Sequence, residues 1–404
     1  MLKYKNIIVI LVLVIGSLGT FYLQSAFAKD NLPRYSFKKI EGNEKEIKDV
    51  RLLASSDNHG KFFESLIITP NKTTYGSEIN FIQSFFGNGF YLPEKITTLQ
   101  KEYRSFMRGK ENPNAFYEDQ NKLAYVDLTE SGSVGAKIFT FKLDILDKKK
   151  ADRETIKVEV PKSREYEFLD TQDIQIVGDE LKIVTLNYKN GTEGIHAYSI
   201  DLPSKRLVGD DLIVSNKQAQ NGEGLHFTRY NETNTMMENK YLLYNLGEYK
   251  LVEQADGGMI EEEINSETVL YDLEKNKKQT IKFPKEIVEA KLANPHHYYD
   301  EKNIYIVGQT PEGFKVFIYD FQSNKLVKKW NYSIHLDDVN SIQMTINKER
   351  LFIAVDRVKA EGEEEPPVEV IVVDLQNGQF LYKGELVGSK KIEGSLNIDG
   401  MEIN

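Results

Sequence analysis

Residues 303–325 read NIYIVGQTPEGFKVFIYDFQSNK and contain the pattern that decides the fold. A polar residue opens a run of four largely apolar residues, Ile304–Val307, and a second apolar run ends in Tyr319, Asp320 and Phe321 before a polar turn with lysine. Apolar runs this short, bounded by turn residues, indicate strands buried on both faces. Only 16 residues separate Ile304 from Asp320, which leaves room for one hairpin and none for a crossover helix.

The same pattern recurs along the chain, with its aspartates 48 to 71 residues apart. The five copies contain Asp144, Asp201, Asp272, Asp320 and Asp374. A leading strand fits before each central run and an outer strand fits after each turn, so each unit has four antiparallel strands. From Asn114 to Leu386 the chain resembles a degenerate β-propeller repeat, without the signature of any named functional family. The resemblance implies an all-β fold of four-stranded antiparallel blades.

The repeat length favours seven blades, with six as the alternative. We expect residues 29–404 to form a single domain. Strands from Tyr35–Ser55 and Lys391–Asn404 are predicted to share one blade, because joining the chain ends would remove two exposed sheet edges. Apolar residues with helical spacing predict a helical insertion near residues 94–107.

The repeated aspartate is interpreted as a turn residue, because a carboxylate at a strand end accepts backbone hydrogen bonds from the turn that follows. The third unit is longer than the others, and its extra residues are placed in the polar stretch Gln254–Glu267.

The N-terminus has the features of an export signal. Lys3 and Lys5 precede a largely apolar run, and Ala26–Ala28 forms a small-x-small cleavage site. Residues 1–28 are therefore a signal peptide or, if uncleaved, an N-terminal membrane anchor. Both alternatives place the rest of the chain outside the cytoplasm, either secreted or attached to the outer face of the cytoplasmic membrane.

Charge and cysteine content exclude several classes of protein. The net charge of -10 argues against nucleic-acid binding, and the absence of cysteine excludes thiol catalysis, cysteine-ligated zinc and disulfide support. Nucleophile-elbow, phosphate-loop and dinucleotide motifs are missing from the sequence. No cofactor is expected, and neither a catalytic nor a metal-binding residue is assigned. The stretch Ser55–Gly60 resembles the Asp-box of sialidase-type propellers but has His59 where that motif needs glycine, and we interpret it as a turn.

Two acidic runs are the candidate binding features. Each falls between the second and third strands of its unit, so both are expected on one rim of a propeller, where they would form a partner-binding acidic surface. Its residues are Glu261, Glu262, Glu263, Glu363, Glu364 and Glu365. Solvated loop tips are the simpler interpretation, and calcium is an alternative ligand for such carboxylates.

The sequence favours a non-catalytic extracytoplasmic binding or scaffold module of the cell envelope, whose rim loops bind a protein or another envelope ligand. The alternative is an extracytoplasmic hydrolase of glycans or peptides. That alternative requires two carboxyl groups at the mouth of a central channel, about 5–10 Å apart.

Overall fold

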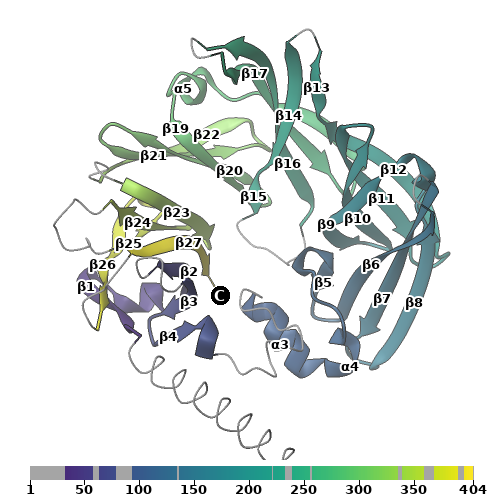
Figure 1. Cartoon of the computed structure of the whole chain (residues 1–404), viewed down its shortest axis with the longest axis horizontal. Coiled ribbons are helices and arrows are strands. Elements are labelled where there is room, and N and C mark those ends of the chain that lie inside the picture. The colour runs from purple at the N-terminus through teal and green to yellow at the C-terminus, as the bar shows by residue number, and fades with distance from the viewer. Residues whose placement is uncertain are drawn as a thin grey trace, which may run out of the picture. The chain divides into compact units, whose positions relative to one another are not determined.

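A computed structural model describes residues 32–57, 63–78, 93–133, 136–220, 222–232, 239–254, 257–334, 339–358, 368–389 and 395–403. These residues are mostly in β-strands (Figure 1). The chain divides into two compact units, one from Met1–Tyr91 and Asp337–Asn404, the other from Leu92–Leu336. Within the described ranges, no helix has the length and apolar character needed to cross a membrane.

The first unit contains two sheets, with strand orders β1-β26-β25-β24-β23 and β27-β2-β3-β4. Both chain ends contribute, because β27 pairs antiparallel with β2. The strands are β1 (Tyr35–Gly42), β2 (Val50–Asp57), β3 (Phe63–Thr69), β4 (Lys72–Tyr75), β23 (Val339–Asn347), β24 (Arg350–Arg357), β25 (Val368–Asp374), β26 (Phe380–Gly388) and β27 (Ser395–Ile403).

The second unit contains four sheets, with strand orders β5-β6-β7-β8, β9-β10-β11-β12, β13-β14-β16-β17-β18 and β15-β19-β20-β21-β22. The strands are β5 (Phe116–Glu118), β6 (Lys122–Ser133), β7 (Ala136–Asp147), β8 (Asp152–Glu159), β9 (Phe168–Val177), β10 (Glu180–Lys189), β11 (Thr192–Asp201), β12 (Arg206–Ser215), β13 (Lys217–Gln220), β14 (Glu223–Arg229), β15 (Asn231–Glu232), β16 (Tyr241–Glu253), β17 (Met259–Asp272), β18 (Lys277–Ile281), β19 (Ala293–Tyr299), β20 (Asn303–Thr310), β21 (Gly313–Asp320) and β22 (Lys325–Ser333). The segment predicted as a helical insertion contains α3 (Glu94–Glu102) and α4 (Arg104–Met107), and α5 (Lys285–Val288) precedes β19.

Consecutive strands pair antiparallel within each sheet, and the two-residue β15 adds the parallel contact to β19. Four antiparallel strands in sequence order are the composition of a propeller blade. The fold class is therefore all-β, as the repeat predicted. The described residues form six sheets, which matches the alternative count rather than the favoured seven.

The central strands are buried on both faces, as their apolar runs predicted. Neighbouring residues of β10 show this: Ile183 and Val184 both have 0% exposure, although successive strand residues point to opposite faces. Ile183 packs in a cluster with Phe141, whereas Val184 packs in a separate cluster with Leu242. Each buried aliphatic side chain of this kind contributes about 1.5–3 kcal/mol relative to an exposed one. A charged residue at either position would therefore disrupt the packing between two neighbouring sheets.

The turn role predicted for the repeated aspartate is confirmed for the last four copies. The carboxylate of Asp320, for example, accepts hydrogen bonds from the backbone N–H groups of Gln322 at 2.9 Å and Ser323 at 2.8 Å. In the first copy of the repeat, the prediction was wrong by three residues. Asp147, not Asp144, occupies the turn position and accepts from the N–H groups of Lys149 and Lys150.

Asp144 has a different role in the second unit. Its side chain is 2% exposed and forms ion pairs with Lys110 at 2.9 Å and Arg153 at 2.7 Å. The Nζ atom of Lys110 also lies 4.7 Å from the centre of the Phe106 ring, so this buried cation attaches the segment after α4 to the outer strands of its sheet.

The predicted sharing of one blade by the chain ends needs a correction. Strand β2 does pair with β27, but β1 pairs with β26 in the other sheet of the unit. The separation of β1 from β2 has a local cause, because Asn43 caps a short 3-10 helix at Glu44–Ile47 and the chain changes direction before Val50. Strand β1 then covers the edge of an existing sheet instead of extending the terminal one.

Candidate functional site

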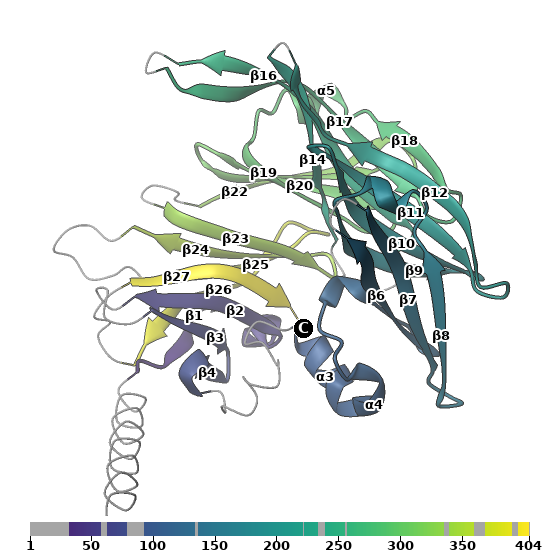
Figure 2. The ribbon, with the colours of Figure 1, turned by 45° about the vertical axis from the view of Figure 1, so that its right-hand side comes forward.

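The third sheet of the second unit carries the longest hairpin among the described residues, slightly longer than the β6–β7 hairpin. Strands β16 and β17 have 13 and 14 residues, and their pairing extends from Tyr241 opposite Asp272 to Glu253 opposite Met259. The outer strand β18 pairs only with Thr268–Asp272. The distal part of the hairpin therefore projects beyond β18 and away from the body of the unit (Figure 2).

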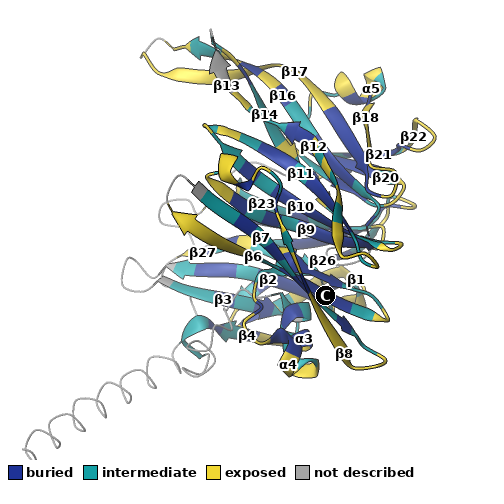
Figure 3. Cartoon of the chain, turned by 90° about the vertical axis from the view of Figure 1, so that its right-hand side faces the viewer, coloured by how far each residue is buried: buried dark blue, intermediate teal, exposed yellow. Residues whose placement is uncertain are grey.

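Exposure along β17 changes abruptly where β18 ends. All nine residues from Met259 to Glu267 are exposed, whereas the five residues from Thr268 to Asp272 are buried (Figure 3). Three exposed residues are large and apolar: Met259 at 57%, Ile260 at 45% and Ile264 at 51%. In the distal hairpin, β17 therefore presents both of its faces to solvent, which a strand serving only to stabilise the fold does not need to do.

The three consecutive glutamates of β17 have different surroundings. Glu262 pairs across the strands with Lys250, whose Nζ lies 3.1 Å from its carboxylate. The carboxylate of Glu263 lies 3.9 Å from Nε2 of His226, which stacks on Tyr249. Glu261 is opposite Leu251 and has no cationic partner among the described residues. The hairpin thus carries partly uncompensated negative charge beside exposed apolar side chains.

The structure describes one of the two acidic runs that the sequence analysis singled out. The extra residues of the third copy of the repeat lie where they were predicted, between the second and third strands of that copy. The loop-tip interpretation was wrong for Glu261, Glu262 and Glu263, because all three lie within β17. Glu363, Glu364 and Glu365 lie outside the described residues, so a joint acidic surface stays a prediction. No apolar–polar alternation in the sequence indicated this strand, because Glu261, Glu262 and Glu263 are consecutive.

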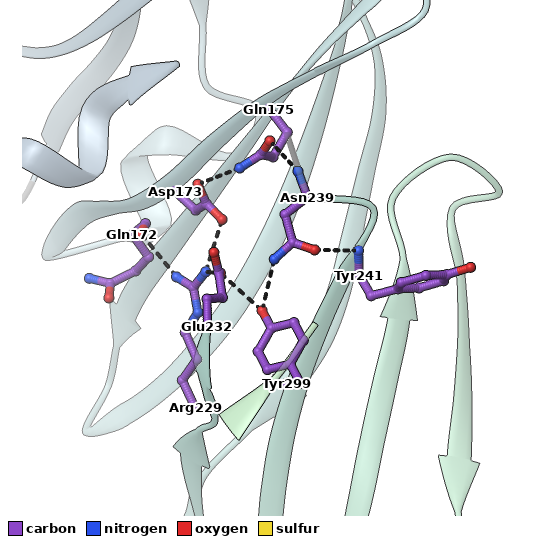
Figure 4. Close-up of polar contacts among 8 residues, drawn as sticks. All are labelled: Gln172, Asp173, Gln175, Arg229, Glu232, Asn239, Tyr241 and Tyr299. Carbon is purple, nitrogen blue, oxygen red and sulfur yellow. Dashed lines mark hydrogen bonds and ion pairs between the residues drawn. The ribbon is translucent and has the colours of Figure 1, made fainter. Parts of the chain in front are cut away.

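A second candidate is a polar network between sheets of the second unit (Figure 4). Its centre is Arg229 at the end of β14, whose Nη2 atom donates to Asp173 of β9 at 2.9 Å and also to Glu232 of β15. Tyr299 of β19 donates its hydroxyl to Glu232 at 2.9 Å. Asn239 donates its side-chain N–H to the Tyr299 oxygen at 3.2 Å. One guanidinium thereby connects three strands that belong to different sheets.

Burial and like charge shift the ionisation of this network. Burial, reinforced by the nearby Glu232 carboxylate, raises the pKa of Asp173 to about 6. Burial disfavours the charge on Arg229, but the two carboxylates outweigh it and raise its pKa well above the usual value. Burial also raises the pKa of Tyr244 to about 12. The network is therefore a charged triad in which Asp173 protonates in mild acid.

The network does not have the arrangement that glycoside hydrolysis requires. Its two carboxylates contact the same guanidinium nitrogen, and their side chains are only 12% and 10% exposed. A hydrolase needs two carboxyl groups that flank a substrate and keep separate acid and nucleophile or base roles. Here the hydrogen bonds are satisfied within the protein, which is the pattern of a structural cross-link.

The histidines lie in separate places. His196 contacts Asp210 through Nδ1 at 2.7 Å, and His297 stacks on Tyr230 with ring centres 4.4 Å apart. Burial lowers the pKa of His297 to about 4 and also lowers that of His296. In the described part of the chain, no group of three or more His, Cys, Asp or Glu residues is arranged to hold a metal ion. His59 lies outside the described residues.

Sequence comparisons assign no family. No family model matches the chain, and no curated protein matches it. Among solved structures, cobalt-substituted ACO from Synechocystis is 10% identical with a TM-score of 0.35, and the match covers 72% of this chain and 63% of that chain. A mutant of Synechocystis apocarotenoid oxygenase is 8% identical with a TM-score of 0.40, and the match covers 91% and 96%. A putative 6-phosphogluconolactonase from Bacteroides fragilis is 11% identical with a TM-score of 0.29, and the match covers 90% and 100%. Likenesses at this level transfer no activity.

Proposed function

We propose that this chain is a non-catalytic binding module of the cell envelope, located outside the cytoplasm, which binds a protein partner through the distal β16–β17 hairpin. The observation that carries the proposal is the run of nine exposed residues from Met259 to Glu267, with three large apolar side chains among them. Exposed apolar residues concentrated on one projecting element favour a role in protein interaction. The proposed location outside the cytoplasm is based on the export features of residues 1–28.

The electrostatics of the second unit also support a binding role over a catalytic one. Asp173 and Glu232 both form ion pairs with Arg229 and are largely buried. The acidic residues of the hairpin are exposed instead, where they can attract a partner of opposite charge.

The test is site-specific photocrosslinking in intact cells. A photoreactive benzoylphenylalanine replaces Met259 on the projecting hairpin, and a matched variant carries it at Val288 of α5, an apolar position with 66% exposure. We expect a discrete higher-mass adduct at position 259 and none at position 288. The adduct should also react with a biotin reagent that does not enter cells, because the partner is proposed to lie outside the cytoplasm.

A shortened hairpin provides a second control. Replacing Lys250–Glu262 by Asn-Gly leaves Tyr249 and Glu263, which already face each other, on either side of a two-residue turn. The matched variant shortens the β6–β7 hairpin between Glu130 and Phe139, which also face each other. With the photoreactive residue at position 264, the adduct should disappear only when the β16–β17 hairpin is shortened. The same adduct pattern at positions 259 and 288 would refute the proposal.

A further inference from the structure

The distal part of β17 has a free backbone edge. Strand β16 pairs with one side of β17 along its whole length, but β18 reaches only to Ile281, opposite Thr268. From Met259 to Glu267 the other side has no strand partner among the described residues. A free edge of this kind presents unpaired N–H and C=O groups to any extended chain that can approach it.

The regular part of this edge is short and well defined. The register between β16 and β17 shifts at Ile264, which is an extra residue between Glu263 and Asn265. A bulge twists its strand and interrupts pairing on the outer side. The ladder available to a partner is therefore Met259–Glu263, a stretch of five residues.

Alternation gives the two faces of this ladder different chemistry. Cross-strand partners point to the same face, so Ile260 lies beside Val252, and Glu262 lies beside its ion-pair partner Lys250. The opposite face carries Met259, Glu261 and Glu263. One face thus has an apolar contact and an ion-paired carboxylate, while the other has an exposed methionine and two carboxylates with little compensation.

These charges determine which occupant fits. A second copy of the chain would bring its own Glu261 and Glu263 near the same residues, and like charges facing each other across strands are destabilising. The chain as a whole has a net charge of -10, which also opposes self-association and attracts cationic segments. A segment with basic residues at alternate positions would place each of them opposite a carboxylate.

We propose that Met259–Glu263 binds an extended segment of a partner protein by strand addition, with basic side chains on the Glu261 and Glu263 face and an apolar side chain against Ile260. The inference rests on the proposed function, because it names the partner chemistry of the same hairpin. Backbone pairing supplies most of the affinity, and the alternating side chains select the partner.

The experiment is a binding titration of the whole chain with a fluorescein-labelled heptapeptide of alternating valine and lysine, followed by fluorescence anisotropy. We expect saturable binding. The double variant Glu261→Lys/Glu263→Lys should weaken it about tenfold, because two favourable cross-strand pairs become unfavourable. The matched variant Asp152→Lys/Glu159→Lys makes the same charge change on exposed positions of β8 and should bind as the unmodified chain does.

Two further peptides separate strand addition from simple charge attraction. One has the same composition with its lysines and valines in separate blocks, and the other has a methyl group on every backbone nitrogen. Weak binding of both supports the inference. Equal binding of the methylated peptide, no saturable binding of the alternating peptide, or dimerisation of the chain through this edge would overturn it. The peptide titration does not decide the photocrosslinking result at position 259. Failure of the strand-addition inference can therefore be distinguished from failure of the proposed function.

Discussion

Two titrating groups of the second unit should have opposite effects on stability in the same pH range. Burial raises the pKa of Asp173 from 3.8 to about 6 and lowers the pKa of His297 from 6.5 to about 4. Each shift corresponds to about 3 kcal/mol of stability that depends on pH. As the pH rises, the unfolded chain releases the Asp173 proton at a lower pH than the folded chain does. As the pH falls, the unfolded chain binds the His297 proton at a higher pH than the folded chain does.

The sign of each effect follows from which state binds more protons. Between pH 4 and 6 the folded chain holds the Asp173 proton and the unfolded chain does not, so stability falls as the pH rises. Over nearly the same range the unfolded chain holds the His297 proton and the folded chain does not, so stability rises with pH. In the unmodified protein the two contributions should therefore largely cancel.

Single substitutions should reveal each contribution. Asp173→Asn removes one titration while keeping a polar contact to Arg229, and His297→Phe keeps an aromatic ring against Tyr230. Between pH 4.5 and 6.5, the unfolding free energy of Asp173→Asn relative to the unmodified chain should rise by about 2 kcal/mol, and that of His297→Phe should fall by a similar amount. The pH-dependent contributions of all other titrating groups cancel in this comparison, because the variant and the unmodified chain share those groups.

The assay is urea unfolding at a series of pH values, followed by the fluorescence of Trp330. This is the only tryptophan of the chain, and it lies on β22 in the same unit as both groups. For the double variant, the difference in unfolding free energy from the unmodified protein should be nearly independent of pH. If the stability difference caused by Asp173→Asn is the same at pH 4.5 and 6.5, the assignment of the raised pKa to this residue is refuted.

Two other substitutions test the packing of the second unit by the same urea assay. Arg229→Met should lower the unfolding free energy by about 3–5 kcal/mol because it leaves two buried carboxylates unpaired, whereas Arg206→Met on exposed β12 should stay within about 0.5 kcal/mol. An effect of Arg229→Met as small as that of the control would contradict the triad. Gly313→Ala should cost about 2 kcal/mol or more, because Gly313 has a φ of +138° and an added Cβ would lie 2.0 Å from the carbonyl oxygen of Tyr332. Full retention of stability would show that the turn adapts to a side chain.

The strands and their order could be predicted because their causes are local. Four apolar residues between polar ones, as in Ile304–Val307, are buried by the adjacent strands and sheets wherever the unit lies. The register within a unit was harder to predict. Asp144 and Asp147 both end apolar runs, and only the pairing of Lys122 with Asp147 decides which of them reaches the turn. The hydrogen bonds of the turn then favour the residue that is already at the end of the strand.

The acidic hairpin was only partly predictable. The length of the insertion was visible in the sequence, but a run of three glutamates favours the interpretation of a solvated loop. Strand pairing prevailed because β16 offers a partner for every position of β17 except the bulged Ile264, including Val252 for Ile260 and Lys250 for Glu262. A strand of this kind is formed by its neighbour rather than by the propensity of its own residues.

The buried triad could not be predicted because its members are far apart in the sequence. Arg229 and Asp173 are 56 positions apart in the sequence, and Glu232 and Tyr299 are 67 positions apart. Each residue alone has the pattern of an ordinary polar strand end, and only the packing of three sheets brings them together. The charges also explain why such a cluster persists at this place. Loss of the guanidinium would leave two carboxylates in a largely buried region, a cost that exceeds the benefit of any single contact. The exposed glutamates of the hairpin have no comparable constraint, and the proposed partner would account for their arrangement.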